Sequence, residues 1–234
     1  MIFAGARVHW IVRPDEPMNF RGAFPRRMKT TALNIPNQIT IARLLLAIVF
    51  FALLSQYSQR APRPILLDVA VVLFVVAAGS DFFDGYLARK WGQITMLGRV
   101  LDPLVDKVLI CGAFILFAGP GFVDDAGKNV TEVSAWMVVV IVGRELLVTG
   151  LRGFNESIGM AFGASLHGKL KMWMQSIAAP VILFIVAHEE SLGWGDAGRI
   201  VKLVFVWLTV GTTVLSMTFY LTRSRHLLEE SGPS

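Results

Sequence analysis

The sequence predicts an all-α, polytopic integral membrane protein with six transmembrane helices and both termini in the cytoplasm. Hydrophobic residues make up 54% of the 234 positions and charged residues only 17%. That balance is typical of helical membrane proteins and rare in soluble domains of this length. Six apolar stretches have lengths suited to a bilayer core of roughly 30 Å.

The six expected helices are apolar runs separated by recognisable breaks. Pro36 and Asn37 precede the first run, where proline suits a helix start because its missing N–H donor is not needed there. Pro62 and Pro64 lie in the break before the second run, and the Gly-Pro-Gly segment at 119–121 ends the third. The expected spans are residues 38–57, 65–89, 97–118, 135–154, 169–187 and 200–221.

Charges in the connections predict the orientation. The N-terminal tail, the second-to-third turn, the fourth-to-fifth loop and the C-terminal tail are basic, whereas the other loops are acidic apart from Arg60 and Arg63. By the positive-inside rule the basic side is cytoplasmic, and a bacterial inner membrane fits best. The expected division is a basic N-terminal tail, a six-helix domain and a short C-terminal tail, at residues 1–33, 34–226 and 227–234.

The N-terminal tail is not expected to carry chemistry. It lacks an apolar core long enough for a signal peptide, and Met18 and Met28 are alternative starts. The net charge of +5 is not arranged as a basic stripe interleaved with aromatic residues, so we expect no nucleic-acid partner.

Four aspartates in otherwise apolar sequence are the main functional signal. A carboxylate at the centre of a spanning helix costs ~2.5–3.5 kcal/mol, so such residues usually have a function. Asp81 and Asp84 share one helix face, Asp102 and Asp106 share another, and the short turn at 90–95 makes the two helices antiparallel neighbours. Oxygen ligands without histidine or cysteine favour Mg²⁺ or Mn²⁺, and Mg²⁺ is usually shared with substrate phosphates.

Two other interpretations of the four aspartates stay open at this point. They can form helix-end salt bridges with Arg89, Arg99 or Lys107. They can also line a cation or proton pathway, since transporters use intramembrane acids as well. A transporter would move ions without releasing a nucleotide.

The pattern Asp81-x-x-Asp84-Gly85-x-x-Ala88-Arg89, eight residues, then Gly98-x-x-x-Asp102-x-x-x-Asp106 resembles the complete signature of the CDP-alcohol phosphotransferase family. The resemblance implies that the four aspartates bind two divalent ions, Mg²⁺ or Mn²⁺, and that Asp106 is also the general base. The acceptor hydroxyl would attack the β-phosphorus of a CDP-linked lipid and expel CMP. A homodimer is also implied. At the CDP-lipid the resemblance places Gly85, Ala88, Arg89, Thr95, Pro36, Asn37 and Thr40.

The acceptor is predicted from basic residues outside the signature. Arg144 and Arg152 are eight apart and share a helix face, and Lys169 opens the next helix. Together they predict a pocket for a phosphate monoester, because arginine makes forked contacts with phosphate. The other interpretations are pairing of Arg144 with Glu145 and anchoring at the cytoplasmic surface, which we favour for Lys171.

Three segments, 34–40, 144–152 and 168–171, resemble the bacterial branch of the family that makes phosphatidylglycerophosphate. This resemblance implies CDP-diacylglycerol as donor and sn-glycerol 3-phosphate as acceptor, at the surface of a lipid bilayer. Met172 departs from the branch, where threonine or serine commonly follows the second lysine. Inositol phosphate, serine and phosphatidylglycerol stay open as acceptors.

Overall fold

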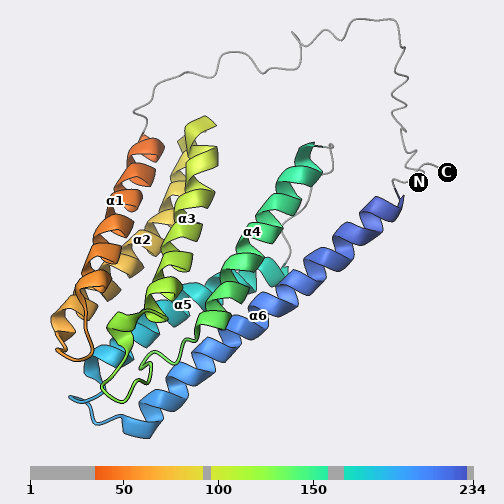
Figure 1. Ribbon diagram of the computed structural model, residues 1–234. Helices are drawn as coiled ribbons and strands as arrows, with labels where there is room; N and C mark the ends of the chain where they lie inside the picture. The colour runs from red at the N-terminus through yellow and green to blue at the C-terminus, as the bar shows by residue number, and fades with distance from the viewer. Residues whose placement is uncertain (1–34, 92–95, 158–165, 231–234) are drawn as a thin grey trace, which may run out of the picture. The chain divides into compact units, whose positions relative to one another are not determined.

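The computed structural model describes the backbone of residues 35–91, 96–157 and 166–230, and the side chains of residues 38–80, 104–154 and 171–222. The described chain is helical and contains no strand, which confirms the predicted fold class at that level. The predicted N-terminal tail lies outside it. The elements are α1 (Ile35–Gln56), α2 (Pro64–Trp91), α3 (Met96–Phe117), the 3-10 turn η2 (Pro120–Phe122), α4 (Ala135–Ser157), α5 (Leu166–His188) and α6 (Gly195–Glu230) (Figure 1).

A shared aromatic core joins the first three helices. α1 packs against both α2 and α3 (Figure 1). The rings of Phe50 and Phe74 lie 5.5 Å apart, and those of Phe114 and Phe117 lie 5.6 Å apart. All four side chains are fully buried, and such ring pairs contribute about 0.5–1.5 kcal/mol beyond area burial. The two helices that carry the four aspartates are therefore held by a common core.

The remaining helices complete the bundle around this core. α5 packs against α2 and α6, α4 packs along α6, and α3 contacts both α4 and α5. This arrangement brings α4 close to α3 and α6.

Some polar side chains are buried inside the bundle, while many large apolar ones are exposed on its outside. Val139 and Leu146 are 69% and 70% exposed, whereas Arg43 and Gln175 are 1% and 0% exposed. Soluble proteins rarely expose apolar surface on this scale, so lipid is the fitting environment. Three helical segments in the described part of the chain are long and apolar enough to cross a membrane, Gln38–Gln56, Lys171–His188 and Gly195–Thr222.

α6 is much longer than the predicted sixth span. It contains 36 residues, Gly195–Glu230, where the apolar run predicts 200–221. Asp196, Arg199 and Lys202 interrupt the apolar character without interrupting the helix, and an acidic residue in the first turn interacts favourably with the helix dipole. At 1.5 Å per residue α6 extends roughly 54 Å, well beyond a bilayer core of roughly 30 Å.

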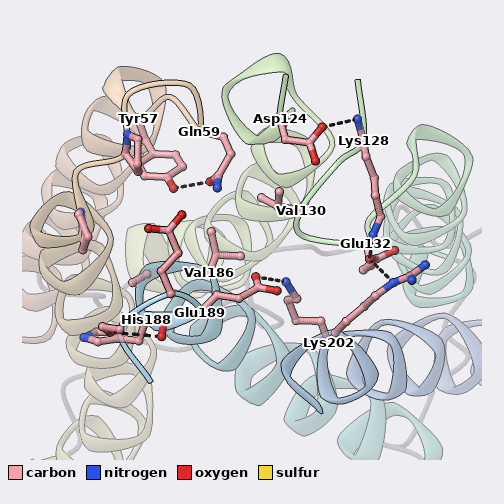
Figure 2. A pocket seen from close by; sticks show the side chains of 16 residues that line it. Tyr57, Gln59, Asp124, Lys128, Val130, Glu132, Val186, His188, Glu189 and Lys202 are labelled. Carbon is pink, nitrogen blue, oxygen red and sulfur yellow. Dashed lines mark hydrogen bonds and ion pairs between the residues drawn. The ribbon is translucent and has the colours of Figure 1, made fainter. Parts of the chain in front are cut away.

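Ion pairs hold together the end of the bundle where the α1–α2, α3–α4 and α5–α6 connections meet (Figure 2). Glu132 accepts a hydrogen bond from Arg199 Nε at 3.0 Å and lies 3.1 Å from Lys128 Nζ. Lys202 is 2% exposed, and its Nζ donates to Glu189 Oε2 at 2.6 Å. These contacts tie the start of α6 to two of the three connections.

Glu189→Gln is expected to lower the free energy of unfolding by about 2 kcal/mol, because Lys202 would remain buried without its counter-charge. Breaking a fully buried pair costs about 3–5 kcal/mol. The Glu189 side chain is 33% exposed, so solvent reduces that figure here. Unfolding in detergent micelles measures the change. The matched control is Glu190→Gln at the adjacent exposed position, with an expected change within about 0.5 kcal/mol. Equal stability of the two variants would contradict a role for the Lys202–Glu189 pair.

Candidate active site

The backbone places the four predicted metal ligands on two consecutive helices. Asp81 and Asp84 lie in the C-terminal part of α2, and Asp102 and Asp106 lie in the N-terminal part of α3. Their spacing keeps each pair on one helix face. The side chains of the first three lie outside the described residues, so the convergence of the carboxylates stays a prediction. The residues whose side-chain surroundings are described also do not include Gly85, Ala88, Arg89, Thr95, Pro36, Asn37 and Lys169.

Asp106 is the one aspartate of the four whose side chain is described. It is half-buried on α3 and lies within electrostatic range of Lys107 and of Lys171 on α5. Thr40, predicted to contact the CDP-lipid, is 2% exposed within α1. Among the described residues no group of three or more histidine, cysteine, aspartate or glutamate side chains could hold a metal ion. A donor set of carboxylates on two adjoining helices fits a hard divalent cation.

Four cations from three helices interact with one another, and we call them the cationic cluster: Lys107 of α3, Arg144 and Arg152 of α4, and Lys171 of α5. Two of them, Lys107 and Lys171, also interact with Asp106. Electrostatic interactions link Lys107 with both arginines, and Lys171 with Arg144 and Lys107. Arg144 and Lys171 are only 5% and 4% exposed. Like charges repel strongly at this depth, and the carboxylate of Glu145, bonded to both Arg144 and Lys171, supplies part of the balancing negative charge.

Arg144 is held on several sides. Its Nη1 donates to Glu145 Oε1 at 2.9 Å, and its Nε donates to Ser216 Oγ of α6 at 2.9 Å. Nη2 donates to the same hydroxyl, and the guanidinium lies 5.7 Å from the centre of the Tyr220 ring. The contacts include the pairing with Glu145 that the sequence left open, and they tie α4 to α6.

Lys171 does not lie at the bundle surface, contrary to the anchoring interpretation. Its Nζ donates to Glu145 Oε1, and its side chain is buried. α5 begins at Leu166 rather than at Lys169, so Lys171 lies more than one turn inside the helix. The start of the apolar run in the sequence does not show this, because the polar first turn of α5 is already helical.

Lys107 joins the cluster through the α4 backbone. Its Nζ donates to Thr149 Oγ1 at 2.7 Å, and that hydroxyl donates to the main-chain oxygen of Glu145 at 2.6 Å. The sequence suggested only aspartate partners for Lys107, because Thr149 is 42 positions away. Arg152 is exposed, and its Nη2 donates to the Tyr220 hydroxyl at 3.3 Å. Arg152 is therefore the more accessible of the two arginines.

A comparison with known proteins assigns the chain to a family. The family model described as CDP-alcohol phosphatidyltransferase matches residues 33–215. The chain belongs to this family. The match confirms the resemblance drawn from the aspartate signature and makes the protein a transferase of the CDP-alcohol phosphatidyltransferase type.

Curated relatives cover most of the chain. A Bacillus subtilis protein named CDP-diacylglycerol–glycerol-3-phosphate 3-phosphatidyltransferase is 32% identical over 206 residues, which is 85% of this chain and 99% of that protein. Proteins of the same name from Rickettsia typhi and Yersinia pestis (strain Pestoides F) are 31% and 30% identical over 180 and 195 residues. These alignments cover 76% and 81% of this chain, and 92% and 93% of the relatives.

The region matched to the CDP-alcohol phosphatidyltransferase family contains every predicted site residue, from Pro36 to Lys169. It ends at residue 215, just before Ser216 and Tyr220. The α6 side chains that contact Arg144 and Arg152 therefore lie immediately beyond the matched region.

A cavity of about 730 Å³ lies at the other end of the bundle, among the three connections (Figure 2). The Tyr57 hydroxyl donates to Gln59 Oε1 at 2.6 Å in its wall. Burial, reinforced by the nearby carboxylates of Glu190 and Glu189, raises the pKa of Tyr57 to about 12. The phenol is therefore a neutral donor at physiological pH. Three cations of the lining, Lys128, Arg199 and Lys202, are paired with Glu132 or Glu189.

Proposed function

We propose that the protein transfers the phosphatidyl group of CDP-diacylglycerol to sn-glycerol 3-phosphate, giving phosphatidylglycerophosphate and CMP. The observation that carries the choice of acceptor is the cationic cluster beside Asp106. Charged donors, and arginine above all, suit the oxygens of a phosphate monoester. The names of the relatives from Bacillus subtilis, Rickettsia typhi and Yersinia pestis support the same acceptor.

In the proposed reaction the acceptor hydroxyl attacks the β-phosphorus of CDP-diacylglycerol. The new oxygen–phosphorus bond forms as the anhydride bond to CMP breaks, and the hydroxyl proton passes to the carboxylate of Asp106. Asp81, Asp84, Asp102 and Asp106 would hold two Mg²⁺ or Mn²⁺ ions. When bound, such ions polarise the phosphoryl group and neutralise charge on the leaving phosphate.

The CDP-lipid is proposed to lie along α1 and the end of α2. Gly85 allows close approach of the nucleotide because it has no side chain, and Arg89 meets the pyrophosphate. Thr40, which is 2% exposed in α1, is included on the resemblance alone. The further lining residues in this proposal are Ala88, Thr95, Pro36 and Asn37.

The proposed topology has all six helices crossing a bacterial inner membrane, with both termini and the active site facing the cytoplasm. The apolar outer surface and the three candidate spans support it. Acidic residues of the connections, among them Asp124, Glu132 and Glu190, gather at the end opposite the proposed active site, as the positive-inside rule expects. A homodimer, with Lys169 adding to the acceptor site of each copy, completes the proposal.

The test is CMP release from CDP-diacylglycerol by the purified protein in detergent with Mg²⁺, with the lipid product identified by mass spectrometry. Glycerol 3-phosphate, inositol 1-phosphate and serine are compared as acceptors. We expect CMP release and phosphatidylglycerophosphate with glycerol 3-phosphate alone. A different preferred acceptor would retain the reaction class and overturn the acceptor. No CMP with any acceptor from folded protein would overturn the proposed reaction.

A further inference from the structure

Glu145 contacts two members of the cationic cluster, although the sequence suggests it only as a pairing partner of Arg144. Its Oε1 accepts hydrogen bonds from Arg144 Nη1 at 2.9 Å and from Lys171 Nζ, which belong to α4 and α5. The residue is 7% exposed. One buried carboxylate oxygen therefore holds two buried cations.

The main chain of Glu145 holds a third cation of the cluster. Its carbonyl oxygen accepts a hydrogen bond from the Thr149 hydroxyl, and Thr149 Oγ1 accepts one from Lys107 Nζ of α3. Through its two oxygen acceptors Glu145 thus connects cations from α3, α4 and α5. The rest of the Arg144 guanidinium is fixed by Ser216 of α6. Glu145 and its two bonded neighbours on α4, Arg144 and Thr149, together contact α3, α5 and α6.

We propose that Glu145 is a positioning residue of the acceptor site, which keeps Arg144 and Lys171 oriented toward the acceptor phosphate. The proposal rests on the proposed function and adds a residue to it. Without the carboxylate the two cations repel each other and must be reordered whenever phosphate binds. A preorganised pair avoids that cost and binds more tightly.

Glu145 has two opposing effects on phosphate binding, and the proposal states which of them is larger. Its negative charge also cancels part of the positive charge that attracts phosphate. If cancellation dominated, removing the charge would strengthen acceptor binding. If positioning dominates, as we propose, removing it weakens binding, by analogy with residues that orient metal ligands, whose loss costs ~10–100-fold in metal affinity or activity.

Glu132 provides a matched control at the other end of the bundle. It also pairs with two cations, Lys128 and Arg199, and its side chain is 13% exposed. Glu132→Gln removes the same kind of double pairing far from Asp106. A purely structural effect of losing such a carboxylate would appear in both variants.

The experiment measures kcat and KM for each substrate with full-length wild-type, Glu145→Gln and Glu132→Gln proteins. We expect Glu145→Gln to raise the KM for glycerol 3-phosphate ~10–100-fold, with the KM for CDP-diacylglycerol unchanged. Glu132→Gln should change neither KM. Glu145→Asp keeps the charge on a shorter side chain and should raise the KM for glycerol 3-phosphate less than Glu145→Gln does. If Glu145→Gln does not fold, the KM of Glu145→Asp for glycerol 3-phosphate tests the proposal instead.

Three results would overturn the inference or its basis. An unchanged or lower KM for glycerol 3-phosphate in Glu145→Gln, with active wild-type protein, would overturn the positioning role alone. A folded Glu145→Asp protein with the wild-type KM would do the same if Glu145→Gln does not fold. Wild-type protein that releases no CMP with glycerol 3-phosphate would overturn the proposed function, and the inference with it.

Discussion

Asp106→Asn is expected to lower the rate of CMP release roughly 10³-fold or more. An amide does not accept the proton of the acceptor hydroxyl, and general-base catalysis alone contributes about 10²–10⁴-fold. Asparagine is also a weaker ligand than carboxylate for a divalent ion. Because the two side chains have the same shape, we expect α3 to keep its packing. The measurement is kcat for CMP release with both substrates at saturation.

Asp68→Asn is the matched control for Asp106→Asn. Asp68 is likewise half-buried on a helix, but it lies near the start of α2, and its carboxylate is 3.7 Å from His188 Nδ1. Asp68→Asn should retain the wild-type rate. An Asp106→Asn protein within about tenfold of wild type, below the contribution of general-base catalysis, would contradict the role given to Asp106.

Arg152→Ala is expected to raise the KM for glycerol 3-phosphate ~10–100-fold. The loss of one hydrogen bond to a charged group costs about 1.5–3 kcal/mol, and each 1.4 kcal/mol corresponds to a factor of ten. Arg152 is exposed, and its described contact with Tyr220 is a single hydrogen bond. The fold should therefore tolerate the change, which the free energy of unfolding can verify. Steady-state kinetics with glycerol 3-phosphate measure the effect.

Arg199→Ala controls for the loss of an exposed arginine elsewhere in the bundle. Arg199 is 50% exposed and pairs with Glu132 at the end opposite the cationic cluster. Its removal should leave the KM for glycerol 3-phosphate unchanged. Equal effects of the two substitutions on that KM would mean that Arg152 has no specific contact with the acceptor.

The sequence predicts the helices well because their signals are local. Apolar runs and their breaks give the right number and order of long helices among the described residues. The Gly-Pro-Gly segment at 119–121 marks the end of α3 at Phe117 and contributes to η2, Pro120–Phe122. The end of a helix is harder to predict where polar residues continue it, as α6 shows on both sides of its apolar run. Hydropathy reports the lipid-facing part of a helix, not its length.

The cationic cluster could be predicted only in part. Spacing shows that Arg144 and Arg152 share a face of one helix. It does not show that Arg144 meets Ser216, 72 positions later, or that Lys171 meets Glu145, 26 positions earlier. Those contacts depend on which faces of α4, α5 and α6 pack together. The pairing of Asp81, Asp84 and Asp102 around metal remains a prediction from the signature alone.

The proposed function depends above all on recognition of the acceptor phosphate by the cationic cluster. Its most direct test compares kcat/KM for glycerol 3-phosphate with kcat/KM for glycerol, the same alcohol without the phosphate, in the wild-type protein. Two or three charge-assisted hydrogen bonds, at about 1.5–3 kcal/mol each, would favour glycerol 3-phosphate by a factor on the order of 10²–10⁶. Similar values for the two acceptors would contradict the claim, since the cluster would then contribute nothing to acceptor recognition.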